Sequence, residues 1–131
     1  MAGDRLLVVD DHSSEIRRVV GIAQGVGFET KDILTAFNVN VALAALVAEG
    51  VGFLVTDLNI DWNWDGLRVV IPAAREAGLA DDHIAMQSHS PDEVLDRIRL
   101  ANRDIKVLTK VDDLRLGAFL QACMASRTDR G

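Results

Sequence analysis

The sequence predicts an α/β fold in which helices cover both faces of one parallel β-sheet. Five short apolar runs alternate with amphipathic stretches along the 131 residues, and this alternation is typical of consecutive βα units. The composition is that of an ordinary globular protein, with 49% hydrophobic and 26% charged residues. Since the length suits one domain, we expect residues 1–131 to form a single domain with a core over about 5–125.

The first half of the chain contains three predicted strands, which are Leu6–Val9, Thr30–Leu34 and Phe53–Val55. Leu6–Val9 and Phe53–Val55 are apolar, as expected of strands that are buried on both faces, whereas Thr30–Leu34 is a weaker strand. We expect the helix between the first two strands to be capped by Ser13 or Ser14. The next helix is expected to open at Asn38 or Asn40 and to end at Gly50.

The second half repeats this pattern with two more predicted strands, Ile84–Met86 and Ile105–Leu108. Residues 66–77 are helical in composition, although Pro72 should kink or shorten the helix. Ser90 is expected to cap the helix that follows, with Pro91 in its first turn. Asp112 is expected to cap the last helix. We place five residues on the apolar face of that helix: Leu114, Leu116, Phe119, Leu120 and Cys123.

Polar groups end four of the predicted strands: Asp10 and Asp11, then Asp57, Ser88 and Lys110. In parallel α/β sheets, ligands bind beyond the carboxyl ends of the strands, which lie about 4.8 Å apart. Three neighbouring carboxylates repel one another unless a cation neutralises them, and an all-oxygen cluster favours a hard ion such as Mg²⁺. These residues predict a site that holds a phosphoryl group on a carboxylate.

The ordered motifs LLVVDDHS, LVTDLN, IAMQS and VLTK resemble those of receiver domains of two-component response regulators. The spacings also match, since 46, 31 and 22 positions separate Asp11, Asp57, Ser88 and Lys110. The resemblance covers residues 5–125. It implies a flavodoxin-like (βα)5 fold with the strand order 2-1-3-4-5, and we interpret the chain as a receiver of the single-domain type.

The resemblance also assigns roles to site residues. Asp57 would be the phosphoacceptor, taking a phosphoryl group from a phosphohistidine of a sensor histidine kinase or a histidine phosphotransfer protein. Ser88 and Lys110 would bind the phosphate and relay its arrival to other proteins. Such a protein catalyses only its own phosphorylation and dephosphorylation, so we do not classify it as an enzyme.

A magnesium site follows from the same resemblance. Asp11 would bind Mg²⁺ directly and Asp10 through water. Asp57 and the backbone carbonyl of Asn59 would supply further oxygens. His12 and His83 show no metal-ligand spacing, so we assign them no role.

Three positions depart from the family pattern. Val111 replaces the usual proline after the lysine, so we expect a trans Lys110–Val111 peptide bond, because a cis bond before a non-proline residue costs about 2.5–4 kcal/mol. Val107 replaces the aromatic residue used for coupling. His89 replaces a small residue, and we expect a solvated side chain there.

The loop after Asp57 also departs from the family, since it is longer by one residue and lacks a proline. It contains both tryptophans of the chain, Trp62 and Trp64. These side chains would either fold back onto the domain or contact a partner. We expect the segment Asp61–Asp65 to change environment on phosphorylation.

The sequence gives weaker support to two alternative functions. A pseudo-receiver would keep the fold as an interaction module that does not depend on phosphorylation. A haloacid dehalogenase-type phosphatase would also use an aspartate nucleophile, but its motif DxDx(T/V) lies on the first strand, and Asn59 replaces the second aspartate. The chain order disfavours the phosphatase.

Charge and cysteine content limit the partners and the compartment. The net charge is −6 and no basic cluster exceeds Arg17–Arg18, so we expect no direct contact with nucleic acid. No apolar run reaches the length of a membrane helix. The single cysteine, Cys123, fits a reducing cytoplasm. The sequence is compatible with a monomer and with a homodimer.

Overall fold

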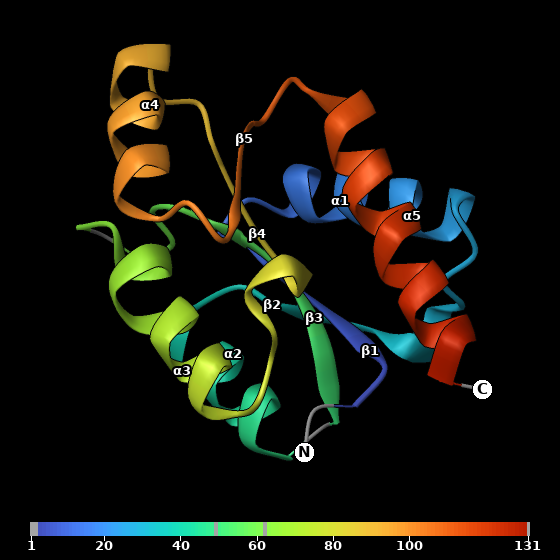
Figure 1. The fold of residues 1–131 in the computed structure, drawn as a ribbon. Helices are drawn as coiled ribbons and strands as arrows, with labels where there is room; N and C mark the ends of the chain where they lie inside the picture. The colour runs from blue at the N-terminus through green and yellow to red at the C-terminus, as the bar shows by residue number, and fades with distance from the viewer. Residues whose placement is uncertain (1–2, 49, 62, 131) are drawn as a thin grey trace.

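The computed structural model describes residues 3–48, 50–61 and 63–130, which form a five-stranded parallel sheet with helices on both faces (Figure 1). The sheet order is β2-β1-β3-β4-β5, which confirms the predicted topology. The strands are β1 (Arg5–Val9), β2 (Ile33–Ala36), β3 (Val51–Asp57), β4 (Ile84–Ser88) and β5 (Lys106–Thr109). The α-helices are α1 (Ser13–Gly25), α2 (Val39–Ala48), α3 (Ile71–Glu76), α4 (Asp92–Ala101) and α5 (Asp113–Arg130).

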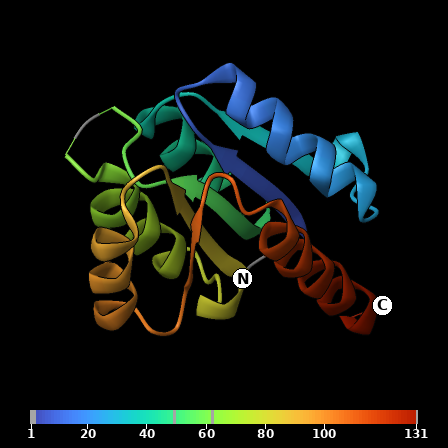
Figure 2. The same ribbon diagram turned by 90° about the horizontal axis from the view of Figure 1, so that it is seen from above.

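Each face of the sheet has its own hydrophobic core, because successive side chains of a strand point to opposite faces. Helices α1 and α5 cover one face and α2, α3 and α4 the other (Figure 2). The core under α1 and α5 includes Leu6, Val8, Phe53, Val55, Leu116, Phe119 and Leu120. The core under the other three helices includes Leu7, Leu54, Ile71, Met86, Leu95 and Ile98.

Two of the four predicted helix caps are confirmed. The side chain of Asn38 accepts a hydrogen bond from Val41 N (2.9 Å), and that of Asp112 accepts one from Arg115 N (3.1 Å). The predictions that Ser13 or Ser14 caps α1 and that Ser90 caps α4 were wrong. His12 occupies the cap position of α1, and Pro91 that of α4, neither with a side-chain cap bond.

Two other expectations need correction. Thr30–Asp32 forms a 3₁₀ turn, so β2 begins only at Ile33. Leu114 is exposed and does not belong to the core under α5. The expected break at Pro72 is confirmed, because a π-helix (Gly66–Val70) is followed by a short α3 (Ile71–Glu76), whose first turn contains Pro72. This break is where the missing proline donor costs least.

Gly66 sets how closely the chain returns to the end of β3. A Cβ atom at this position would lie 1.8 Å from the backbone oxygen of Asp57. The amide of Gly66 donates to the carbonyl of Leu58 (3.0 Å). A side chain cannot be accommodated here without moving the strand end that carries Asp57.

Cys123 is buried in the core under α1 and α5. Burial raises the pKa of its thiol to about 12. The side chain therefore serves as a small apolar group, as the sequence indicated. Among the described residues, we find no helix that is both long and apolar enough to cross a membrane.

Candidate functional site

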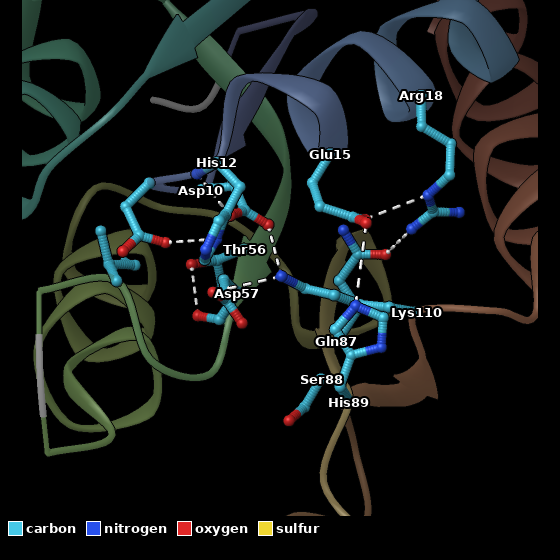
Figure 3. Close-up of polar contacts among 12 residues, drawn as sticks. Asp10, His12, Glu15, Arg18, Thr56, Asp57, Gln87, Ser88, His89 and Lys110 are labelled. Atoms are coloured by element: carbon cyan, nitrogen blue, oxygen red, sulfur yellow. Dashed lines mark hydrogen bonds and ion pairs between the residues drawn. The ribbon is translucent and has the colours of Figure 1, made fainter.

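The carboxyl edge of the sheet brings the predicted site residues together (Figure 3). Asp57 is the last residue of β3 and Ser88 the last of β4. Asp10 follows β1 directly, and Lys110 follows β5. Asp10 is 1% exposed and Asp57 6%, so two carboxylates are nearly removed from water.

Lys110 lies between the two buried carboxylates. Its Nζ atom is 2.8 Å from Oδ2 of Asp10 and 3.3 Å from Oδ2 of Asp57. The lysine thus neutralises part of the repulsion that the sequence assigned to a metal ion alone. Breaking such a buried pair by removing one partner is expensive, because the remaining charge stays buried.

The environment of Asp57 raises its pKa to about 6. Burial is the main cause, and the charge of Asp10 adds to it. The charge of Lys110 and a hydrogen bond from the backbone amide of Asn59 act in the opposite direction. Burial also opposes the charge of Lys110, but its hydrogen bond with Asp10 and the charge of Asp57 outweigh this and raise the pKa of the lysine.

Ser88 lies at the same edge, but its hydroxyl is engaged elsewhere. Its Oγ atom lies 2.8 Å from Oγ of Ser90 and accepts a hydrogen bond from the amide of Ser90 (3.0 Å). Figure 3 shows the hydroxyl pointing away from Asp57. To reach a group on Asp57, the hydroxyl has to leave Ser90 first.

His12 also belongs to this cluster, although no role was predicted for it from the sequence. Its Nδ1 atom lies 2.9 Å from Oδ1 of Asp11 and 3.3 Å from Oδ1 of Asp10. Its amide also donates to Oδ1 of Asp10 (3.0 Å). The only sequence signal was the adjacency of a histidine to the acidic pair.

A second polar network, also not predicted, lies beside the site under α1. Arg18 donates to the buried side chain of Gln87 (2.8 Å) and to Glu15 (3.1 Å), and it also pairs with Asp113. Gln87 is the neighbour of Asp57 in the sheet register. A glutamine within the apolar run IAMQS was the one sequence signal for this network, since its partners are far apart in the chain.

The departures from the family pattern are placed as follows. The Lys110–Val111 bond is trans, as predicted. Val107 is buried in the core under α2, α3 and α4. The side chain of His89 is 64% exposed and lies 3.8 Å from Glu15, which confirms a largely solvated histidine.

The loop after Asp57 is held by its own side chains. Asp65 accepts hydrogen bonds from the amides of Ile60 (2.7 Å) and Asp61 (2.9 Å). Asp61 in turn accepts one from the amide of Val39 at the start of α2 (3.2 Å). Trp64 is 38% exposed and has a φ of 59°, which is unusual for a residue other than glycine. Trp62 lies outside the described residues.

The donor set fits a divalent cation. Asp10, Asp11, His12 and Asp57 each offer one ligand atom, and these atoms lie within 4.8 Å of one another. By formal charge, three carboxylates and the ammonium of Lys110 leave −2, which one divalent ion balances. Carboxylate oxygens are ligands that Mg²⁺ prefers.

Comparison with solved structures identifies the class to which this fold belongs. A receiver domain protein (CheY-like) from Methanospirillum hungatei JF-1 superposes with a TM-score of 0.72 at 17% identity, over 99% of this chain and 100% of its own. The signal receiver domain of an HD domain-containing protein from Pseudomonas fluorescens Pf-5 gives 0.72 at 14% identity, over 97% and 98%. The chain has the fold of a response regulator receiver domain.

A third match shows that fold alone does not give function. A de novo designed Rossmann 2x3 fold protein superposes with a TM-score of 0.64 at 13% identity, over 88% of this chain and 84% of its own. Neither a protein-family model nor a curated protein matches the sequence. The functional argument therefore depends on the site residues.

Proposed function

We propose that this protein is a phosphoacceptor receiver of a two-component or phosphorelay system, phosphorylated on Asp57. One observation carries the proposal: a buried carboxylate at the strand edge lies within 3.3 Å of a buried lysine and beside two further aspartates. A structural ion pair needs only one carboxylate for one lysine. The excess negative charge at this edge is explained by a bound cation.

The reaction needs Asp57 in its ionised form. One carboxylate oxygen of Asp57 forms a bond to phosphorus while the P–N bond of a phosphohistidine breaks. The electron pair of that bond stays on the imidazole nitrogen of the donor. Burial raises the pKa of Asp57 to about 6. This value is still below neutral pH, so the nucleophile is mainly ionised at pH 7.

The other site residues stabilise the charge that the transfer brings in. Lys110 is near enough to Asp57 to pair with oxygens of the attached phosphoryl group. Asp10, Asp11, Asp57 and the backbone carbonyl of Asn59 would hold Mg²⁺. The ion would supply positive charge to the phosphoryl oxygens. Ser88 would donate its hydroxyl after leaving Ser90.

We infer that the partners are a sensor histidine kinase or a histidine phosphotransfer protein upstream, and a protein target downstream. The chain would work in the cytoplasm as a switch of protein contacts, without acting on a separate substrate. The net charge of −6 supports protein rather than nucleic-acid targets.

Intact mass after incubation with acetyl phosphate and Mg²⁺ tests the proposal. We expect the wild-type chain to gain the mass of one phosphoryl group and Asp57→Asn to gain none. Asp82→Asn, which changes an exposed carboxylate away from the site, is the matched control and should behave as wild type. An equal mass gain in Asp57→Asn would refute the assignment.

A pseudo-receiver is the second candidate, because Val107 replaces the coupling aromatic residue and Ser88 is engaged by Ser90. It predicts a folded wild-type protein that gains no phosphoryl mass with Mg²⁺ at saturating donor. The same mass measurement therefore separates the two functions.

A further inference from the structure

His12 places an imidazole nitrogen among the carboxylates to which the proposed function assigns a metal ion. Its Nδ1 atom lies 2.9 Å from Oδ1 of Asp11 and 3.3 Å from Oδ1 of Asp10. Asp57 belongs to the same cluster. Figure 3 shows the side chain of His12 near those of Asp10 and Asp57, and this side chain is 66% exposed.

The spacing of these atoms is close to that of a coordination sphere. Two ligands on opposite sides of an ion, each about 2.1 Å away, are roughly 4.2 Å apart. The four candidate ligand atoms lie within 4.8 Å of one another. The Nδ1 atom of His12 already lies well inside this limit, at 2.9 Å from Asp11 and 3.3 Å from Asp10, and its side chain is 66% exposed.

The positions of the carboxylates are less adjustable. Asp10 is held by the amide of His12 (3.0 Å) and by Lys110 (2.8 Å), and Asp57 is held by Lys110 (3.3 Å). A neutral imidazole adds a ligand to this frame without adding charge. The formal charge of −2 is therefore still balanced by one divalent ion.

The nitrogen changes which ion the site prefers. Mg²⁺ is a hard ion that favours oxygen ligands, whereas imidazole binds Co²⁺ and Zn²⁺ well. We propose that His12 is a direct metal ligand and that it increases the preference of this site for borderline transition ions, such as Co²⁺ or Zn²⁺, over Mg²⁺. The inference rests on the metal site of the proposed function and concerns its ligand set and selectivity.

Titration calorimetry of the full, unphosphorylated chain with Co²⁺ and with Mg²⁺ tests this, at about pH 7.5, where most imidazoles are neutral. All-oxygen sites also bind Co²⁺ more tightly than Mg²⁺, so the decisive quantity is the change in the ratio of the two affinities. We expect His12→Asn to lose about tenfold in Co²⁺ affinity and less than about twofold in Mg²⁺ affinity.

The matched control is His89→Asn, because its side chain is as exposed as that of His12 (64% against 66%) but lies outside the cluster. It should leave both affinities unchanged. Asp11→Asn should lower the affinity for both ions, and this loss would locate the binding at this site. A second variant, His12→Gln, repeats the test should His12→Asn fail to fold.

Two results would overturn the inference: an unchanged Co²⁺ affinity in the His12 variants, or an equal loss for both ions. The proposed function is judged separately by the mass gain on Asp57 of the wild-type chain with excess Mg²⁺. Selective loss of Co²⁺ binding without any phosphorylation of the wild type would leave the metal inference standing and remove only the proposed function.

Discussion

The acidic side of the site, on β1 and β3, differs from the end of β4, which carries Ser88. On the acidic side, Asp10 and Asp57 already lie against Lys110. On the other side, the hydroxyl of Ser88 bonds Ser90 instead of turning to Asp57. The sheet fixes where each Cα lies, but a short hydroxyl takes whichever local partner its loop offers. Charged groups in this site are thus preorganised, and the hydroxyl is not.

The largest effect should come from removing the charge that holds the acidic side together. Lys110→Met leaves Asp10 and Asp57 buried without a cation, so we expect the free energy of unfolding at about pH 7 to fall by about 3 kcal/mol. Urea unfolding without metal measures this loss. Lys106→Met, an exposed lysine on the same strand, should change stability little. An equal loss in both variants would contradict the role of Lys110.

The next effect is the pH dependence that Asp57 contributes. Its folded pKa of about 6 exceeds the ordinary value of 3.8, so in this range the folded state binds more protons than the unfolded state. Stability is therefore lost as the pH rises through about 6. Between about pH 4.5 and about pH 7, this contribution should cost about 2 kcal/mol.

Other groups titrate in the same range, so the measurement is the difference between two proteins. We expect the unfolding free energy of Asp57→Asn, relative to wild type, to rise by that amount over the same pH interval. A pH-independent difference between the two would show that Asp57 has an ordinary pKa.

A smaller effect concerns the hydroxyl side. Ser90→Ala removes one partner of Ser88, so the hydroxyl turns toward Asp57 more easily. We expect stability to fall by about 1 kcal/mol and the rate of phosphorylation by acetyl phosphate to rise. Ser88→Ala should cost similar stability but slow phosphorylation. If both variants phosphorylate at the wild-type rate, the hydroxyl plays no part in the transfer.

The smallest expected effect is in the loop Asp61–Asp65. Trp64 is only partly exposed. The carboxylates of Asp65 and Asp61 accept hydrogen bonds from backbone amides, which tie the loop internally and to α2. We expect a modest change in tryptophan emission when Mg²⁺ and beryllofluoride are added together. Trp64→Phe, which leaves one tryptophan, assigns the change. Unchanged emission at saturation would exclude this loop as a reporter of phosphorylation.

The sequence predicted what depends on local pattern. The strands, the acidic pair, Asp57 and Lys110 follow from apolar runs that each end in a polar group. Asn38 and Asp112 also cap their helices as predicted. The cap Ser90 was wrong because its amide and hydroxyl bond Ser88 instead.

The remainder depends on contacts between distant parts of the chain. Arg18 reaches Gln87 and Asp113 across 69 and 95 positions, and no periodicity in a short window encodes such a pairing. The ion pair between Lys110 and Asp10 was also not predicted, because the resemblance assigns this lysine to the phosphate. Leu114 was misplaced because α5 begins with an exposed turn.

The burial of Cys123 has a practical consequence for labelling experiments on this protein. A thiol that is 1% exposed with a pKa of about 12 reacts very slowly with maleimides or nitroxide reagents at neutral pH. It is the only cysteine in the chain. A cysteine introduced at an exposed position of the 61–65 loop can therefore be labelled selectively in the otherwise native sequence, and a spin label there would follow that loop alone.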